Sequence, residues 1–368
     1  MRSPTSVAIF IAFFLALDFY FFQAVKTITQ SASPKTRMIV YIIYWSLTAV
    51  SVIGLLLFMF TGPDLLGKKI RTYLFAGIIG LFLAKLTACL FFLVDDLRRV
   101  IQWLSAKLFF NNTEVANVDD GISRSAFLSW MGVLLGTTVF GSLVYGFNNK
   151  YDYRVRKIKL KYSNLPAAFR GLKILQVSDI HSGSFTNKEA VKHGIDKMMA
   201  QQADIILFTG DLVNDRATEM DDYKDIFSTL KAPMGVFSTL GNHDYGDYVQ
   251  WPNENGLTKS QNLLNLQQVH ADMGWRLLMN EHVILEKESG KIALIGIENW
   301  SNKARFPKHG RMDLAYPGTE NIPFKILMSH DPSHWEAQVI PTYGDIDLTL
   351  SGHTHGMQFG IEIPGFHW

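Results

Sequence analysis

Residues 172–181 read Leu-Lys-Ile-Leu-Gln-Val-Ser-Asp-Ile-His, and this stretch decides how the second half of the chain folds. The apolar residues from Ile174 to Val177 form a short run that is typical of a buried strand. The run ends at Asp179 and His181. Aspartate and histidine are common metal-ligand types and are not favoured in a hydrophobic core. Open α/β sheets collect their ligands at the carboxyl ends of parallel strands, so we expect further strand ends to meet this one.

The composition combines two unlike halves. Of the 368 residues, 48% are hydrophobic and 18% are charged, but residues 1–150 are membrane-like whereas residues 151–368 have a soluble character. The formal net charge is +2 and the second half has no stripe of Lys and Arg interleaved with aromatic residues, so no nucleic-acid partner is expected. The single cysteine, Cys89, lies in an apolar run, which excludes a disulfide framework and a thiolate metal site.

The first half contains four apolar stretches that are long enough to cross a bilayer as helices: residues 7–25, 38–60, 72–94 and 126–147. A signal peptide is the alternative for the first stretch, but no small-residue cleavage site follows it. Asp18 and Lys85 lie inside two of the stretches, where ionisable side chains are costly. We expect these two residues to form a structural pair. Alternatively, they would take part in a relay or contact a lipid headgroup.

The segment between the third and fourth stretches, residues 95–125, has apolar residues at helical spacing among basic ones. We expect it to form an amphipathic helix along the membrane surface. The basic residues of the loops do not decide which side the second half faces, because the short loops and the segment after the fourth stretch favour opposite sides. Residues 123–128 resemble a twin-arginine export signal with Ser125 at the second arginine, so we expect an extracytoplasmic second half.

Strands and helices alternate in the second half, which predicts parallel strand pairs. The expected strands are residues 172–178, 204–209, 235–240, 324–328 and 346–350. The expected helices are residues 188–202, a segment around 223–230, and residues 263–273. Three further runs, residues 275–278, 282–285 and 292–297, are expected to form an antiparallel patch. A closing strand or hairpin is expected to follow the last motif, and since the sequence given ends soon after it, at Trp368, we expect residues 151–368 to form a domain that is short at its C-terminus.

The five expected strands outside the antiparallel patch all end in residues of metal-ligand type. These residues are Asp179, His181, Asp211, Asn242, His243, His330, His353 and His355. Taken singly, each would be a turn, cap or core residue, but their joint occurrence at strand ends favours a metal centre. Carboxylates, imidazoles and one amide oxygen without thiolates suit Mn, Fe or Zn. Two such ions about 3.5–4 Å apart would activate a hydroxide and hold phosphoryl oxygens during an in-line displacement.

The motifs Asp-x-His, Gly-Asp, Gly-Asn-His-Asp, His and Gly-His-x-His occur here in this order. Over residues 170–356 the sequence therefore resembles the calcineurin-like metallophosphoesterase superfamily. Leu165-Pro166 followed by residues 172–181 is most similar to its membrane-anchored bacterial branch, some of whose members hydrolyse lipid-linked or nucleotide-sugar-lipid pyrophosphates. The resemblance implies an α/β fold in which four transmembrane helices precede two packed sheets flanked by helices.

The resemblance also implies a role for each motif residue. One divalent metal ion would be bound by Asp179, His181 and His355, the other by Asn242, His330 and His353, and Asp211 would bridge the two. His243 would face the substrate and protonate the leaving oxygen, and Asp244 would orient its ring. The implied activity is hydrolysis of a phosphorylated small molecule or lipid: a phosphodiester, a phosphomonoester or a lipid-linked pyrophosphate.

Two other functions are compatible with parts of the sequence. A catalytically silent membrane receptor or scaffold would bind a phosphorylated ligand on the same fold, but a silent member is expected to lose His243 or a ligand. A zinc amidohydrolase carries its His-x-His early in the chain, whereas here the motif comes last. Two long loops predict an apolar and basic mouth for a phospholipid headgroup, since they contain Trp251, Trp300 and Phe306 together with Lys303, Arg305 and Lys308. The sequence carries no indication of the oligomeric state.

Overall fold

The computed structural model describes residues 4–60, 67–109, 125–251, 256–304, 306–355, 362–363 and 366–367. The chain divides into two compact units, Met1–Asp152 and Tyr153–Trp368, and each unit is described by itself.

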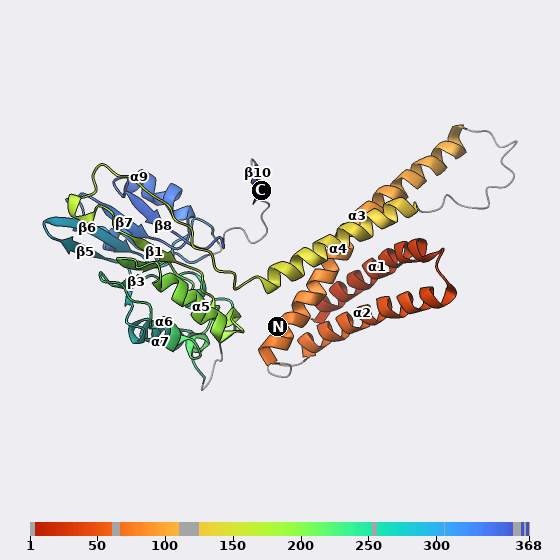
Figure 1. Ribbon diagram of the computed structural model, residues 1–368, viewed down its shortest axis with the longest axis horizontal. Coiled ribbons are helices and arrows are strands. Elements are labelled where there is room, and N and C mark those ends of the chain that lie inside the picture. The colour runs from red at the N-terminus through yellow and green to blue at the C-terminus, as the bar shows by residue number, and fades with distance from the viewer. Residues whose placement is uncertain are drawn as a thin grey trace. The chain divides into compact units, whose positions relative to one another are not determined.

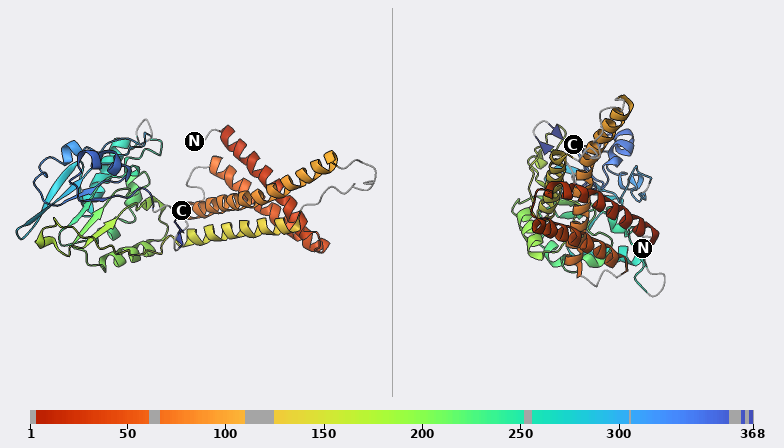
Figure 2. Two further views of the ribbon diagram at one scale, coloured as in Figure 1. Left: turned by 90° about the horizontal axis from the view of Figure 1, so that it is seen from above. Right: turned by 90° about the vertical axis from the view of Figure 1, so that its right-hand side faces the viewer.

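The N-terminal unit consists of long apolar helices. They are α1 (Pro4–Thr29), α2 (Pro34–Phe60), α3 (Gly67–Phe109) and α4 (Ala126–Asn148), and α3 and α4 pack along each other (Figures 1 and 2). Each of the four is long and apolar enough to cross a membrane, which confirms the predicted four candidate spans.

Helix α3 corrects the expectation of a separate surface helix. Its 43 residues run without interruption through Asp95 and Asp96 to Phe109, so the amphipathic segment continues the third span. No Gly or Pro lies between Leu90 and Phe109 to break the helix. Arg98 and Arg99 also pair with the two aspartates one turn earlier, which supports the helical backbone there. The rest of the predicted segment, residues 110–124, lies outside the described residues, as do Ser123 and Arg124 of the export-like motif.

Small residues allow α3 and α4 to approach closely. A Cβ atom on Gly136 would lie 2.8 Å from the carbonyl oxygen of Ala84, and one on Gly132 would lie 3.0 Å from that of Ala88. The spacing Gly132-x-x-x-Gly136 places both glycines on one face of α4, which is a common way for membrane helices to pack.

The C-terminal unit contains two four-stranded sheets. The first has the order β1 (Ile174–Val177), β2 (Ile205–Phe208), β3 (Val236–Ser238) and β4 (Arg276–Leu277), with every neighbouring pair parallel. The second has the order β5 (Glu281–Lys287), β6 (Gly290–Gly296), β7 (Lys325–Met328) and β8 (Leu348–Leu350). Only β5 and β6 pair antiparallel within this sheet. A short hairpin joins β9 (Glu362–Ile363) and β10 (Phe366–His367).

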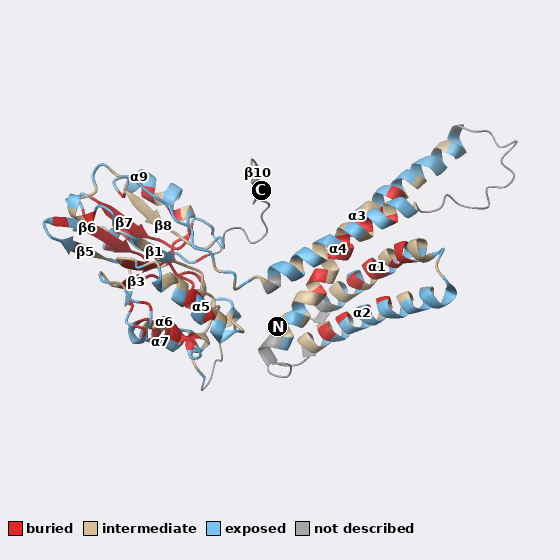
Figure 3. Cartoon of the chain, in the orientation of Figure 1, coloured by how far each residue is buried: buried red, intermediate tan, exposed pale blue. Residues whose placement is uncertain are grey.

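The sheets pack face to face between helices. One buried cluster contains Leu207 of β2, Phe237 of β3, Leu294 of β6 and Ile326 of β7, so inward side chains of both sheets share a core. The alternate residues Ala293 and Leu327 of the second sheet belong to another cluster on its outer face. Helices α5 (Lys188–Met199), α6 (Lys224–Phe227) and α7 (Lys259–Asp272) lie on one side of the sheets, and α9 (Ile340–Thr342) lies on the other (Figure 1). Burial follows the same layers: the inner strands β2, β3, β6 and β7 are mostly buried, the outer strands are less so, and the outer faces of the helices are exposed (Figure 3).

The α/β fold of two sheets after four helices is the predicted fold class. One strand assignment was wrong: β4 does not join β5 and β6 in an antiparallel patch but extends the first sheet in parallel to β3. Helix α7 also begins four residues earlier than predicted, because Thr258 and Gln261 form a capping box at its start. The segment predicted around 223–230 is helical only over Lys224–Phe227, after a short 3₁₀ turn at Ala217–Met220.

Candidate metal centre

The carboxyl ends of five strands bring the predicted motifs to one place. Asp179 and His181 follow β1, Asp211 follows β2, and Asn242 to Asp244 follow β3; His330 follows β7, while His353 and His355 follow β8. The ends of β1 and β8 are tied across the two sheets, since Gln176 Nε2 donates to the carbonyl oxygen of Ser351 over 2.7 Å. The sandwich therefore positions residues that lie more than 170 positions apart in the sequence.

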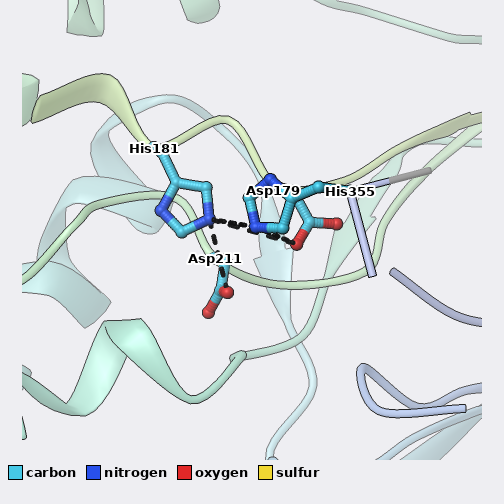
Figure 4. Close-up of side chains that lie close together, drawn as sticks. All are labelled: Asp179, His181, Asp211 and His355. Carbon is cyan, nitrogen blue, oxygen red and sulfur yellow. Dashed lines mark hydrogen bonds and ion pairs between the residues drawn. The ribbon is translucent and has the colours of Figure 1, made fainter. Parts of the chain in front are cut away.

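The first group of candidate ligands is Asp179, His181, Asp211 and His355, whose ligand atoms all lie within 4.8 Å of one another. His181 Nε2 lies 3.1 Å from His355 Nε2 and 3.5 Å from Asp211 Oδ2, and His355 Nε2 lies 3.5 Å from Asp179 Oδ1 (Figure 4). Neighbouring ligand atoms around an ion with metal–ligand distances of about 2.1 Å lie about 3 Å apart. The spacing of these nitrogen and oxygen atoms therefore fits a divalent cation.

The second group is Asp211, His330 and His353, again with ligand atoms within 4.8 Å of one another. His330 Nε2 lies 3.1 Å from Asp211 Oδ2, and its other ring nitrogen lies 2.7 Å from the carbonyl oxygen of Thr209. In the neutral ring, the proton on Nδ1 is donated to the carbonyl, so the lone pair of Nε2 faces the group. Asn242 joins the group through Oδ1, which lies 2.8 Å from His353 Nδ1.

Asp211 belongs to both groups. Its Oδ1 accepts the backbone N–H of His243 over 2.8 Å, while Oδ2 faces His181 on one side and His330 on the other. Burial raises the pKa of Asp211, but the hydrogen bond and charge of His330 outweigh it and hold the pKa below its usual value. In turn, burial lowers the pKa of His330 but the Asp211 carboxylate raises it to about 9. An anionic oxygen between two sets of nitrogens is the arrangement that a bridging ligand requires.

The backbone of the site is strained to present these ligands. Five candidate ligands have left-handed backbone angles: Asp179 (φ 52°), His181 (φ 45°), Asp211 (φ 61°), His353 (φ 70°) and His355 (φ 50°). Non-glycine residues rarely adopt this region, and such strain is concentrated at functional sites. The glycines of the motifs have a separate role, because a Cβ on Gly241 would lie 2.2 Å from Asp211 Oδ1 and one on Gly352 would lie 2.3 Å from Asp179 Oδ2.

His243 lies beside the first group, with its ring centroid 4.7 Å from that of His181. The predicted role of Asp244 in orienting this ring is wrong. His243 Nδ1 lies 2.8 Å from the carbonyl oxygen of Asn214, whereas the buried Asp244 carboxylate accepts backbone N–H groups of Asp211, Leu212, Val213 and Gly241. Asp244 therefore fixes the loop that carries Asp211. Burial and the nearby Asp211 charge raise the pKa of Asp244 to about 7.

Two residues at the site were missed by the sequence analysis. Tyr248 accepts a hydrogen bond from Asn242 Nδ2 over 2.8 Å, and its half-exposed ring lies 4.4 Å from that of His243. Asp331 is 1% exposed, and its Oδ2 lies 3.5 Å from His353 Nε2. Burial raises the pKa of Asp331, but hydrogen bonds from Ser301 and Ser333 hold it below its usual value, so the side chain is an anion. The only sequence signal for Asp331 was its place directly after His330.

The predicted aromatic and basic mouth is partly formed. Phe306 packs edge-on against the ring of His353, with centroids 5.1 Å apart. Trp300 is instead 9% exposed and packs against His334 and Lys308. Trp251 is half-buried under Arg216, whose guanidinium lies 4.5 Å from its ring centroid. Arg305, which was also part of the predicted mouth, lies outside the described residues.

Comparison with known families agrees with the arrangement of the motifs. Residues 172–357, about half of the chain, match the family described as calcineurin-like phosphoesterase. The chain belongs to this family. Residues 1–150 match a second family, described as the probable transmembrane domain of calcineurin-like phosphoesterases. With its four candidate spans, the chain is a multi-pass membrane protein, and the predicted resemblance is confirmed.

The chain is similar to several curated proteins. It is 26% identical to a zebrafish "transmembrane protein with metallophosphoesterase domain" over 68% of this chain and 55% of that protein. It is 28% identical to the uncharacterized metallophosphoesterase YkoQ of Bacillus subtilis, over 62% of this chain and 78% of that protein. It is also 28% identical to the UDP-2,3-diacylglucosamine pyrophosphatase LpxG of Chlamydia trachomatis, over 55% of this chain and 70% of that protein. The chain thus spans about half the length of the zebrafish protein.

Proposed function

We propose that this protein is a membrane-anchored enzyme that hydrolyses a phosphoester with the help of two divalent metal ions. The observation that carries the proposal is the position of Asp211 Oδ2, which faces His181 Nε2 at 3.5 Å and His330 Nε2 at 3.1 Å. Because this oxygen belongs to both ligand groups, two ions held there would share a ligand and lie close together. The oxygen and nitrogen donors, without thiolates, suit Mn, Fe or Zn.

In this proposal Asp179, His181 and His355 hold one ion, Asn242, His330 and His353 hold the other, and Asp211 bridges them. When bound, such ions lower the pKa of water and polarise phosphoryl oxygens. The protein contributes the orientation of its ligands: Thr209 fixes the ring of His330, and Tyr248 fixes the amide of Asn242 so that its oxygen faces His353.

His243 is proposed to act on the leaving group. Its Nδ1 is held by the carbonyl oxygen of Asn214, so Nδ1 carries a proton and Nε2 is the nitrogen that can exchange one. A ring fixed in this way beside the first group can protonate the oxygen that departs from phosphorus.

For the substrate we propose a phosphoester with a lipid portion. The similarity to LpxG, named as a pyrophosphatase of a diacylated nucleotide sugar, supports a lipid-linked pyrophosphate within this class. The four candidate membrane spans would keep the enzyme near such a substrate. A silent receptor on the same fold is not favoured, because every motif residue is retained.

The catalytic unit is proposed to face away from the cytoplasm. The basis is the export-like sequence at residues 123–128. A reporter that is active only outside the cytoplasm, fused after residue 160, should be active. Activity of a cytoplasm-specific reporter at the same position would reverse the assignment.

The function is tested by purifying the full chain in detergent and assaying it against an aryl phosphodiester, an aryl phosphomonoester and a lipid-linked pyrophosphate. Hydrolysis should disappear after prolonged treatment with a chelator and return when Mn²⁺ is added. Full activity in excess chelator would contradict the metal-dependent mechanism, and the preferred substrate identifies the ester class.

A further inference from the structure

Asp331 is a buried carboxylate at the metal centre to which the family motifs give no role. Asp331 directly follows the candidate ligand His330, but its side chain points toward another candidate ligand, His353. Oδ2 of Asp331 lies 3.5 Å from Nε2 of His353, which follows the neighbouring strand β8. Its other oxygen, Oδ1, accepts the backbone N–H of Ser333 over 2.8 Å. Oδ2 is buried and has no hydrogen-bond partner within the part of the chain that the structure describes.

The contact decides which nitrogen of His353 carries the proton. A carboxylate only accepts hydrogen bonds. If Nε2 of His353 carried a lone pair, that lone pair would face the buried Asp331 carboxylate at 3.5 Å and be repelled. A proton on Nε2 is instead attracted to the carboxylate. The proton of a neutral ring is therefore on Nε2, and the lone pair is on Nδ1. The distance is long for a hydrogen bond, which is common in sites that tighten when their ligand binds.

The other side of the ring supports the same conclusion. His353 Nδ1 lies 2.8 Å from Asn242 Oδ1, and the amide of Asn242 is oriented by its donation to Tyr248 over 2.8 Å. With the proton on Nε2, two electron-pair donors face each other at this distance, which is unfavourable unless a cation lies between them. The spacing is that of two ligands of one ion with metal–ligand distances of about 2.1 Å.

His330 provides an internal comparison. There a backbone carbonyl, that of Thr209, holds Nδ1 and leaves Nε2 for the metal. At His353 the holding group is on the opposite nitrogen and is a full anion. A carboxylate in this position both orients a histidine ligand and makes it a stronger base toward a metal ion.

We propose that Asp331 is a positioning residue that holds the proton of His353 on Nε2 and so directs Nδ1 to the second metal ion. The inference rests on the proposed function, since it requires that the second group binds a metal. It also predicts an unusual order of substitutions. In Asp331→Asn the backbone N–H of Ser333 selects the amide oxygen, so the NH₂ group is turned toward His353 and opposes a proton on Nε2. In Asp331→Ala a water molecule can still accept that proton.

The test is calorimetric titration of Mn²⁺ into the full-length, chelator-treated protein in detergent. One of the two binding events should weaken by about 10–100-fold in Asp331→Asn, and by less in Asp331→Ala, while the other event is unchanged. Asp347→Asn is the matched control, because Asp347 also accepts a backbone N–H, that of Lys325, but lies before β8 and away from the ligands. It should bind Mn²⁺ as the wild type does.

A double-mutant cycle separates positioning from folding. In a His353→Ala background, Asp331→Asn should cause no further loss of Mn²⁺ affinity, whereas a structural defect would lower affinity in both backgrounds. The melting temperature of each metal-free variant, measured alongside, reports any general loss of structure. The proposal is overturned if Asp331→Asn leaves the Mn²⁺ affinity unchanged, or lowers it equally in the wild-type and His353→Ala backgrounds. It is also overturned if Asp331→Ala weakens Mn²⁺ binding more than Asp331→Asn does, or if one binding event disappears completely, as expected when a ligand is removed. If the wild type binds no Mn²⁺ at all, the proposed function fails instead.

Discussion

Both units of the protein bury charged side chains, but they neutralise them differently. In the N-terminal unit, Asp18 of α1 is fully buried and Lys85 of α3 is 7% exposed, and their Nζ and Oδ1 atoms lie 2.5 Å apart. Thr48 of α2 donates to the same carboxylate, and Tyr44 donates to the carbonyl oxygen of Asp18 over 2.8 Å. The charge is balanced within the protein, and three helices are tied together.

The metal centre of the C-terminal unit is arranged in the opposite way. Its carboxylates face imidazole rings, and acceptor atoms face one another, as at His353 Nδ1 and Asn242 Oδ1. Under the proposed function, such a cluster is completed by cations from outside. A buried charge alone therefore does not indicate a binding site. A binding site is indicated where several buried acceptor atoms point toward one another and no donor or opposite charge lies among them.

The largest effect is expected from removing the shared carboxylate. Asp211→Asn should leave both metal positions poorly occupied, because a bridging carboxylate neutralises two cations, whereas Asn242→Ala removes one neutral oxygen from one position and should reduce occupancy less. Metal content per chain, measured by elemental analysis after gel filtration, checks this. Two tightly held ions in the Asp211 variant would refute the bridging role.

The next effect concerns the residue that lies beside the metals without being a proposed ligand. His243→Ala should lower turnover by about 10²–10⁴-fold while both ions stay bound, because positioned acids contribute on this scale. The loss should be smaller for a nitrophenyl leaving group, which departs as a stable anion. Equal losses for good and poor leaving groups would exclude the acid role, and a fall in metal content would make His243 a ligand.

The ion pair of Asp18 and Lys85 should affect the stability of the protein when it is mutated, but not its metal content. Lys85→Met leaves the Asp18 carboxylate buried without its partner and should destabilise the protein by about 3–5 kcal/mol. Replacing both residues by leucine should cost much less, because no uncompensated charge remains. Thermal unfolding in detergent measures both, and metal content should not change. If the single and double variants were equally destabilised, the pair would not be neutralising its own charge.

The smallest effect comes from a buried histidine outside the site. His270 is fully buried, its ring nitrogens have no hydrogen-bond partner among the described residues, and burial lowers its pKa to about 3. Between this value and an unfolded pKa of about 6.5 only the unfolded state binds the proton, so stability is complete above pH 6.5 and falls as the pH decreases.

The loss attributable to His270 should be about 1.4 kcal/mol per pH unit within that window. His270→Leu should remove this component, so the difference in unfolding free energy between variant and wild type should shift in favour of the variant from pH 7 to pH 5. Denaturant unfolding of the chelator-treated proteins measures it. A difference that does not depend on pH would show that His270 is protonated in the folded protein.

The sequence predicted the location of the candidate site well because its information is local. Each motif directly follows an apolar strand, so Asp179, Asp211 and His330 could be placed at strand ends without knowing the three-dimensional structure. The parallel pairing of β1 and β2 followed from the helix between them. Long apolar runs likewise located the four candidate spans.

Features set by contacts distant in sequence were not predictable. The two-residue strand β4 carries no periodicity, and only packing decides that it pairs with β3. The carboxylate of Asp244 accepts backbone N–H groups, which every residue except proline has. The sequence therefore could not distinguish this role from that of a residue that orients the ring of His243. Asp331 and His353 are brought together by the pairing of β7 and β8.

The left-handed backbone at the ligand positions also bears on how such a protein would evolve if it lost its metals. At His181, His353 and His355, glycine would fit the backbone without the steric cost of a side chain, which is roughly 1–2 kcal/mol per residue. Under the proposed function, selection for metal binding keeps imidazoles there against that cost. A descendant that had become a silent receptor would be expected to drift toward glycine or asparagine at these three positions first, while Asp244, which supports the loop itself, would be retained longer.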